Sequence, residues 1–309
     1  MSERIRSDTA WSGIRRITRR DDEYPAHLRE LAEAPDPLYV RGGLVRDDAL
    51  AVAVVGSRRA TSYGLRVAED LGHALAARGI TVVSGLARGI DGAAHRGALR
   101  AGGRTIAVLG SGADVIYPPE HRPLASLVAE SGAVISPFAP GTPPLAYHFP
   151  ARNRVIAGLA LGVVVVEAAE RSGALITARL ASELGREVMA VPGGVTSAMS
   201  RGAHELIRDG ATLVQGWEDV VAQLPLQWRE CVQPAERSAR QGAGQPGGAP
   251  IVSADETAAV LRIFGEEPVT IDAVIERSGI GSARAAALLL ELELDGRVRQ
   301  IAGKRFVQV

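Results

Sequence analysis

Short runs of mostly apolar, β-branched-rich residues alternate with longer, alanine-rich amphipathic stretches between Ala49 and about Leu224. The runs expected to form strands lie at Ala51–Val55, Thr81–Ser84, Thr105–Leu109, Ala133–Ser136, Val163–Val166, Glu187–Val191 and, more briefly, Thr212–Val214. Several lack polar alternation, which is typical of strands buried on both faces. Strands separated by helices form βαβ units. Residues 49–224 are therefore predicted to form an α/β domain with an extended Rossmann-like, doubly wound parallel sheet.

The flanking segments differ in composition from this region. Residues 1–48 are charged and contain Pro25, Pro35 and Pro37, and we interpret them as a lead-in with a short helix near Ala26–Ala34. Residues 225–250 are rich in Pro and Gly, which predicts a flexible linker.

Residues 251–309 have the pattern of a small winged-helix domain. The expected helices and strands lie at about Ala254–Phe264, Ile271–Ser278, Ser282–Asp295, Val298–Ile301 and Arg305–Val309. Three helices followed by a hairpin are typical of a winged helix.

Cysteine content and hydropathy indicate a cytoplasmic protein without membrane insertion. Cys231 is the only cysteine and cannot form an internal disulfide. The arginine-rich N-terminus lacks the apolar core of a secretory signal, and the longest apolar run, Val155–Val166, is too short to cross a bilayer.

The basic residues exclude one enzyme class. Lys304 is the only lysine, whereas a GxxxxGK[ST] phosphate loop needs a lysine near its glycines, so the chain is not a Walker-type ATPase. The formal net charge is zero. Binding to nucleic acid would therefore depend on a local basic cluster rather than on overall charge.

The predicted strands are followed by loops rich in glycine and serine. These loops are Gly56-Ser57-Arg58-Arg59, Ser84-Gly85-Leu86-Ala87-Arg88-Gly89, Gly110-Ser111-Gly112, Ser172-Gly173 and Pro192-Gly193-Gly194. Carboxyl ends of parallel strands share one sheet edge, where ligands bind, and the helix N-termini there attract anions. A tight turn is the simpler explanation for any one loop. Five such loops at one edge favour a phosphate-binding pocket.

Arginines and aromatic rings accompany these loops. Arg58 follows the first strand, and Arg152-Asn153-Arg154 follows the aromatic stretch Tyr147-His148-Phe149. Guanidinium forks suit phosphate oxygens, and rings stack on unpaired bases. Alternatively, one of these arginines pairs with Glu167 or Asp91. The candidate phosphate-contacting residues are Gly56, Ser57, Arg58, Ser84, Gly85, Gly89, Gly110, Gly112, Arg152, Asn153, Arg154, Ser172, Gly173 and Thr177.

No catalytic or metal-ligating set is predicted. Asp91 and His95 lie one turn apart, and His204 lies in another expected helix, but no compact His/Cys/Asp set accompanies them. Asp91 is expected to be a first-turn or capping acid with His95 packed above it. A Ser84-His95-Asp91 triad is disfavoured because no nucleophile elbow is present.

The motifs over residues 49–217 resemble those of the DprA/Smf family. They are Gly56-Ser57-Arg58 with Tyr63-Gly64, SGLARGIDGAAH (84–95), VLGSGADVIYP (108–118), FPARNRVIAGL (149–159), VVEAAERSGALITA (165–178) and AVPGG (190–194). The lead-in at 24–44 is also similar. The resemblance implies a non-enzymatic protein of natural transformation, without a cofactor, that binds and protects incoming single-stranded DNA regardless of sequence. It also implies loading of the RecA recombinase and a homodimer.

The chain departs from the family pattern at several positions. Pro137 stands where an acid is common, and His121 and His204 stand where asparagine is usual. The N-terminal helical, SAM-like domain of many members is expected to be truncated or absent, because few residues precede Tyr24.

Two enzyme classes have similar sheets. A nucleotide phosphoribohydrolase has PGGxGTxxE, whereas Pro192-Gly193-Gly194 continues here without the Gly-Thr pair or the glutamate. An NAD-dependent oxidoreductase has GxGxxG after its first strand, which residues 56–64 lack. The phosphoribohydrolase remains the main alternative.

Charge distinguishes the two predicted domains. Residues 251–309 carry seven Lys/Arg and nine Asp/Glu, whereas residues 50–224 carry sixteen and fourteen. Acidic residues on the third winged-helix stretch would repel phosphates in a major groove. DNA affinity is therefore assigned mainly to the central domain, although Arg297, Arg299, Lys304 and Arg305 make the wing basic.

Overall fold

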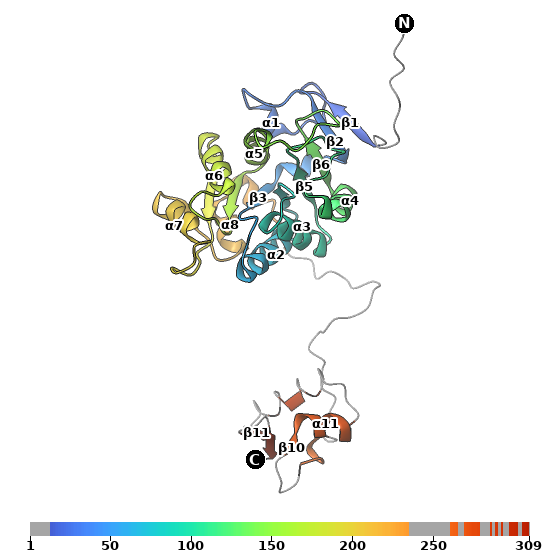
Figure 1. The fold of residues 1–309 in the computed structure, drawn as a ribbon, viewed down its shortest axis with the longest axis vertical. Helices are drawn as coiled ribbons and strands as arrows, with labels where there is room; N and C mark the ends of the chain where they lie inside the picture. Colours follow the sequence, from blue (N-terminus) through green and yellow to red (C-terminus); the bar gives the residue numbers. More distant parts are fainter. Residues whose placement is uncertain are drawn as a thin grey trace. The chain divides into compact units, whose positions relative to one another are not determined.

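The computed structural model describes residues 13–234, 260–264, 269–278, 285, 288–289, 292, 297–301 and 305–308. The chain forms two compact units, Met1–Ala239 and Arg240–Val309 (Figure 1). Each unit is described separately below.

The first unit is built on a nine-stranded sheet in the order β1-β2-β6-β5-β4-β3-β7-β8-β9. The strands are β1 Ile14–Ile17, β2 Leu38–Gly42, β3 Ala51–Val55, β4 Thr81–Ser84, β5 Thr105–Val108, β6 Ala133–Ser136, β7 Gly162–Val165, β8 Glu187–Ala190 and β9 Thr212–Leu213. The run from β6 to β9 is parallel, and β2 pairs antiparallel with β6. The predicted doubly wound α/β sheet is confirmed.

Helices connect these strands and cover both faces of the sheet. They are α1 Ala26–Arg29, η2 Arg46–Ala49, α2 Ser62–Ala76, α3 Ile90–Arg100, η3 Pro119–His121, α4 Arg122–Ser131, α5 His148–Leu159, α6 Gly173–Glu183, α7 Arg201–Arg208, α8 Trp217–Gln223 and α9 Leu226–Arg229. Apolar residues of α1, α5 and α6 pack in one core cluster, and those of α2, α3 and α8 pack in another. Figure 1 shows α2 and α3 on one side of the sheet and α1 and α5 on the other.

The buried strands β3, β4 and β7 divide their side chains between these two clusters. In β3, Ala51, Ala53 and Val55 face the first cluster, whereas Val52 and Val54 face the second. Successive side chains of a strand point to opposite faces, so a strand covered by helices on both sides needs apolar residues at every position. This requirement explains the uninterrupted sequence AVAVV.

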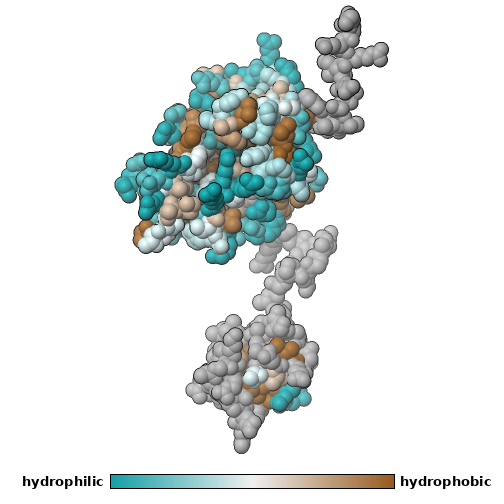
Figure 2. Space-filling model, viewed as in Figure 1, coloured by the Kyte–Doolittle hydropathy of each residue, from teal (hydrophilic) through white to brown (hydrophobic). Residues whose placement is uncertain are grey.

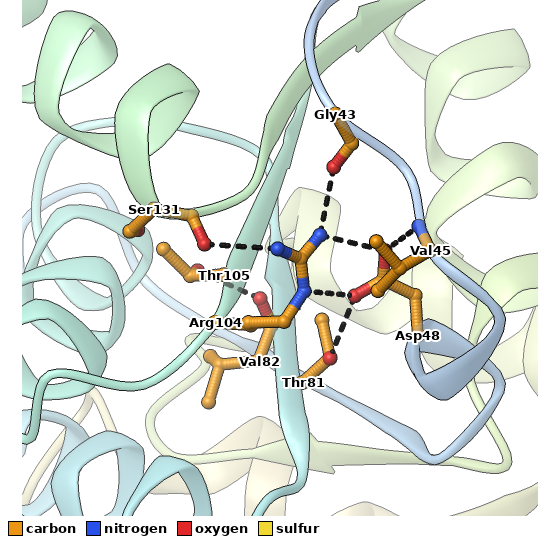
Figure 3. A network of polar contacts seen from close by, with 8 residues as sticks. All are labelled: Gly43, Val45, Asp48, Thr81, Val82, Arg104, Thr105 and Ser131. Carbon is orange, nitrogen blue, oxygen red and sulfur yellow. Dashed lines mark hydrogen bonds and ion pairs between the residues drawn. The ribbon is translucent and has the colours of Figure 1, made fainter.

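The lead-in belongs to the sheet, which the sequence did not predict. Its strands β1 and β2 pair with each other, and β2 pairs with β6. Asp48 fastens the end of this segment, because its carboxylate accepts hydrogen bonds from Arg104 Nε at 2.8 Å and from Thr81 Oγ1 at 2.9 Å (Figure 3). Arg104 also donates to the carbonyls of Gly43 and Ser131. A boundary at residue 49 therefore does not separate two folding units.

The predicted linker begins too early. Helix α9 follows Pro225, and Trp228 and Val232 pack against the cluster that contains α2 and α8. The backbone N–H of Gln233 donates to Arg78 O at 3.1 Å. Residues 225–234 are thus part of the first unit because aromatic and apolar side chains among them are partly buried. Residues 235–250 lie outside the described part of the chain.

The second unit contains a three-stranded sheet in the order β10-β12-β11. Its described elements are β10 Val269–Thr270, α11 Ile271–Ser278, β11 Val298–Ile301 and β12 Arg305–Gln308. Val274, Leu288, Leu292 and Phe306 share one core. The helix at 271–278 and the hairpin match the predicted winged helix. Most of the helices expected at 254–264 and 282–295, and the turn at 302–304, lie outside the described residues.

The visible face of the first unit is mostly hydrophilic, with separate small hydrophobic patches (Figure 2). Within the described part of the chain, no helix is both long and apolar enough to cross a membrane.

Candidate nucleic-acid interface

A groove lies where the winding of the sheet reverses direction. Strands β4, β5 and β6 follow β3 on one side, and the chain then crosses to place β7 on the other side of β3. The groove is lined by residues from the loops after β3 and β7 and from α5 and α6. Ligands of open α/β sheets bind at this switch point, outside the carboxyl ends of the strands.

Three arginines on the groove are exposed. Arg58 and Arg59 follow β3, and Arg171 follows β7, and all three line the groove. None of them forms an ion pair with any residue that the structure describes. Arg88 differs, because Glu120 accepts its Nε–H at 2.5 Å. The groove therefore offers three guanidinium groups to an anionic ligand.

Aromatic rings form the wall beside Arg58. The guanidinium carbon of Arg58 lies 4.8 Å from the Phe149 ring centroid, and the Tyr117 ring lies 6.5 Å from the same centroid. Tyr117 is 39% exposed. Together with Gly110 and Ser111, these side chains line a smaller pocket that adjoins the groove. Charge and stacking surface are thus placed within one site.

The N-terminus of α6 opens onto the groove. Ser172 is the N-cap, and its Oγ accepts the N–H of Ala174 at 3.3 Å. Gly173 is exposed and has no atom within 4 Å of its potential Cβ position. Thr177, one turn later, is buried and lines the groove. The predicted residues Ser172, Gly173 and Thr177 therefore line the same groove as Arg58, and the α6 dipole favours an anion there.

Arg152 also reaches the groove, but it is 4% exposed and has a structural role. Its guanidinium donates to Gly85 O at 2.5 Å and Val108 O at 2.6 Å, and its Nε donates to Asn153 Oδ1 at 3.1 Å. Burial lowers the pKa of Arg152 to about 10, although nearby Asp91 acts in the opposite direction. The expectation of a free phosphate-binding Arg152 is corrected, because its Nη1 and Nε donors already serve the Gly85 and Val108 carbonyls and the Asn153 side chain. Asn153 is buried and donates to Gly173 O at 3.4 Å.

Arg154 lies away from the groove. It does not line that site, and its guanidinium lies 3.3 Å from Glu33 of the lead-in. Residues two apart on an α-helix are separated by about 200° around the axis, so Arg152 and Arg154 face opposite ways. The prediction that both arginines bind phosphate at one site is wrong, because only Arg152 reaches the groove.

The predicted glycines mainly permit close packing. A Cβ on Gly56 would lie 2.6 Å from Ile90 Cγ1, and one on Gly110 would lie 2.9 Å from the Phe149 ring. A Cβ on Gly85 would collide with Arg152, and Gly89 adopts a φ of 75° at the start of α3. Gly112 faces the loop at 139–142 rather than the groove. Tight turns therefore explain these glycines better than direct phosphate contact does.

The predicted serines on the first two loops, Ser57 and Ser84, also form hydrogen bonds within the domain. Ser84 is fully buried and donates to Val54 O at 2.6 Å, so it does not line the groove. Ser57 lines it, and its Oγ accepts the N–H of Arg59 at 3.0 Å. Ser57 thus holds the loop that presents Arg58 and Arg59.

The acidic residues near the groove support the loops. Glu167 accepts hydrogen bonds from Thr61 N at 2.8 Å and Thr61 Oγ1 at 2.5 Å, and not from an arginine. Asp91, in the first turn of α3 as expected, accepts the N–H groups of Gly85 and Ala87. Burial raises the pKa of Asp91, and the Arg152 guanidinium counteracts this rise. Among the described residues, no group of three or more His, Cys, Asp or Glu is placed to hold a metal.

Two histidines hold loops at this edge. His121 Nδ1 donates to Leu86 O at 2.8 Å, and Leu86 has a φ of 56°. His204 Nε2 lies 3.1 Å from Gly193 O. Both imidazoles are therefore placed to stabilise loops after β4 and β8. Pro137 directly follows β6 and is partly buried.

Comparison with known proteins decides the family. A family model described as DNA recombination-mediator protein A matches residues 15–225, and a DprA winged helix domain model matches residues 244–304. The chain belongs to the DprA/Smf family. The first match includes most of the lead-in, in agreement with its place in the sheet of this DprA/Smf-type domain.

Relatives in the DprA/Smf family match over most of the chain. Protein Smf of Escherichia coli is 43% identical over 281 residues, covering 91% of this chain and 74% of that protein. The DNA processing protein DprA of Streptococcus pneumoniae is 47% identical over 203 residues, covering 66% and 72%.

Two solved DprA structures share the fold. That of Streptococcus pneumoniae has a TM-score of 0.65 with 44% identity, covering 70% of this chain and 76% of that one. That of Helicobacter pylori has a TM-score of 0.58 with 29% identity, covering 64% and 90%, and was described for its single-stranded DNA binding mode.

Sequence reasoning missed three side chains of the site. Arg59, Arg171 and Tyr117 line the groove or the adjoining pocket, yet they were not among the candidates. Arg59 and Arg171 lie in the loops that follow β3 and β7, and Tyr117 lies in VLGSGADVIYP (108–118), so the sequence did indicate their positions. The sequence did not indicate that these side chains are exposed, because exposure depends on how neighbouring loops pack.

Proposed function

We propose that this protein binds single-stranded DNA at the groove beside β3 and β7, without catalysing a reaction. The observation that carries the proposal is the placement of Arg58, Arg59 and Arg171, exposed and without ion pairs among the described residues, beside Phe149 and Tyr117. Arginines attract backbone phosphates, and aromatic rings stack on bases of any identity.

This arrangement favours a single strand over a duplex. The faces of bases in a duplex are covered by their neighbours, so stacking on Phe149 or Tyr117 requires unpaired or unstacked bases. The α6 N-terminus and the guanidinium groups contact the backbone and carry no sequence information. Binding should therefore depend little on sequence.

The wider role that we propose follows from family membership. The chain would protect incoming DNA in natural transformation and load the RecA recombinase onto it, acting as a homodimer. The description of the family as recombination mediators and the DNA-processing relatives support this role. Loading is tested by measuring strand exchange by the recombinase on DNA coated with a single-strand-binding protein, with and without this protein.

Binding is tested by titrating a fluorescent oligodeoxythymidine and a hairpin duplex of equal nucleotide number at two salt concentrations. We expect tighter binding of the single strand and a linear fall of log affinity with log salt. Equal affinity for both DNAs would contradict the proposal. Incubation of the same complexes with ATP and Mg²⁺ should produce neither ATP hydrolysis nor DNA cleavage. Either activity, lost on Arg58→Glu, would make the groove an active site.

A further inference from the structure

A second cluster of rings lies on the loop after β6 and at the start of α5. Phe138 and His148 are stacked, with centroids 4.1 Å apart and ring planes 29° apart. Tyr147 meets His148 edge-on, with centroids 4.5 Å apart. Tyr147 is 72% exposed, so most of its ring faces solvent instead of packing in the core. We refer to Phe138, Tyr147 and His148 as the outer ring cluster.

The loop that carries this cluster is held in place by hydrogen bonds. Thr142 O accepts the N–H of Gly112 at 2.9 Å, and Thr142 Oγ1 donates to Ala139 O at 2.6 Å. Both carboxylate oxygens of Asp114 accept the N–H of Gly141 at 2.9 Å. Gly112 permits this approach, since a Cβ there would lie 2.8 Å from Ala139 O. Tyr147 is therefore presented by an ordered loop.

Further hydrogen bonds fix the end of the loop. His148 Nδ1 donates to Pro143 O at 3.2 Å, and the N–H of His148 donates to Leu145 O at 3.0 Å. An exposed ring on an anchored loop loses little conformational entropy when a flat ligand stacks on it.

The outer ring cluster continues the proposed DNA site. Phe149, which faces Arg58, is the next residue but one after Tyr147. Pro144 lines the pocket beside Phe149, and Ala146 lines the groove. The loop thus borders both cavities through Pro144 and Ala146 and carries Tyr147 at its end. Tyr147 itself lines neither cavity, but its exposed ring directly follows Ala146, so a strand that extends out of the groove past Ala146 can reach it.

We propose that the outer ring cluster is a second base-stacking station, which binds a nucleobase of the strand where it leaves the groove. This inference rests on the proposed function, and it extends the DNA footprint beyond the groove. Tyr147 makes the contact, and His148 and Phe138 support its position. Because Tyr147 and Phe138 carry no positive charge, the station contributes stacking rather than phosphate binding.

The test compares Tyr147→Leu with Tyr147→Phe in the full chain. Leucine keeps an apolar side chain but removes the ring, whereas phenylalanine keeps the ring and is the matched control. Affinities are measured for oligodeoxythymidines of increasing length. Tyr147→Leu should bind long oligonucleotides about tenfold more weakly than wild type, since one stacked base contributes roughly that factor or more. Short oligonucleotides that fill only the groove should bind Tyr147→Leu and wild type with equal affinity.

Salt dependence supplies the second readout. The slope of log affinity against log salt should stay unchanged in Tyr147→Leu, because no phosphate contact is lost. Tyr147→Phe should behave as wild type at every length. Unchanged affinity of Tyr147→Leu at all lengths overturns the second station, as does an equal loss of affinity at all lengths. Failure of the wild type to bind any oligonucleotide instead overturns the proposed function itself.

Discussion

The guanidinium carbon of Arg58 lies 4.8 Å from the centroid of the Phe149 ring. A guanidinium over an aromatic face is attracted by the ring quadrupole and keeps its N–H groups free at the edge. The contact therefore orients Arg58 over the groove and leaves its donors available for phosphate. It also places the stacking face and the positive charge within one nucleotide of each other.

Arg58→Glu should weaken single-stranded DNA binding by about tenfold or more and reduce the salt slope by roughly 0.7 for each lost phosphate contact. Arg154→Glu is the matched control, because Arg154 pairs with Glu33 outside the groove and should keep both quantities near wild type. The measurement is fluorescence anisotropy over a salt series. A loss of affinity at an unchanged slope would show that Arg58 acts through the fold.

Arg152→Gln should destabilise the fold by about 3 kcal/mol, because it leaves the carbonyls of Gly85 and Val108 without their donor and Asp91 without its nearby cation. Arg152→Lys should restore only part of this stability, since an ammonium cannot reproduce the guanidinium fork. Urea denaturation monitored by circular dichroism measures both. Wild-type stability with weakened DNA binding would instead restore Arg152 as a phosphate ligand.

His95 should make the fold sensitive to acid. Thr105 Oγ1 donates to Val82 O, so it accepts from His95 Nδ1 at 2.7 Å, which places the ring proton on Nδ1. Nε2 is buried and has no hydrogen-bond partner among the described residues. Burial lowers the pKa of His95 to about 3 from an ordinary 6.5.

The unfolded chain therefore binds a proton at His95 over a pH range in which the folded chain does not. The stability that the fold gains from a neutral His95 is complete above about pH 6.5. As the pH falls from there toward about 3, the free energy of unfolding decreases by up to about 1.4 kcal/mol per pH unit. Between pH 7 and pH 5, His95→Gln should lose about 2 kcal/mol less unfolding free energy than wild type. Parallel pH profiles of the two proteins would contradict this assignment.

Truncation distinguishes the contributions of the two units. A chain ending at Pro234 should keep its stability and its single-stranded DNA affinity within about threefold, because every groove residue lies before that point. A chain ending at Leu224 should lose on the order of 3 kcal/mol of stability, since Trp228 and Val232 no longer cover the core.

The alternative is that the basic wing itself contacts DNA. Replacement of Arg297, Arg299 and Arg305 by alanine in the full chain should leave DNA affinity near wild type. A loss above about tenfold in both this variant and the chain ending at Pro234 would make the wing a DNA contact.

Local sequence predicted the central sheet closely. The strands Ala51–Val55, Thr81–Ser84 and Ala133–Ser136 have the predicted bounds, because strands buried on both faces need unbroken apolar runs. The strands β1 and β2 were missed. Their sequences, IRRI and LYVRG, are short and mix charged with apolar residues. They join the sheet only because β2 pairs with β6 and β1 pairs with β2.

The sequence by itself determined the fold class, the loops at the sheet edge and the family motifs, because hydrophobic periodicity and turn residues are local properties. Only the tertiary structure decided which arginines are available. Arg152 is buried and donates to the carbonyls of Gly85 and Val108, and Arg154 pairs with Glu33 of the lead-in. Arg58, Arg59 and Arg171 remain exposed on the groove. Desolvation and hydrogen-bond partners depend on residues distant in sequence, so identical side chains two positions apart acquired different roles.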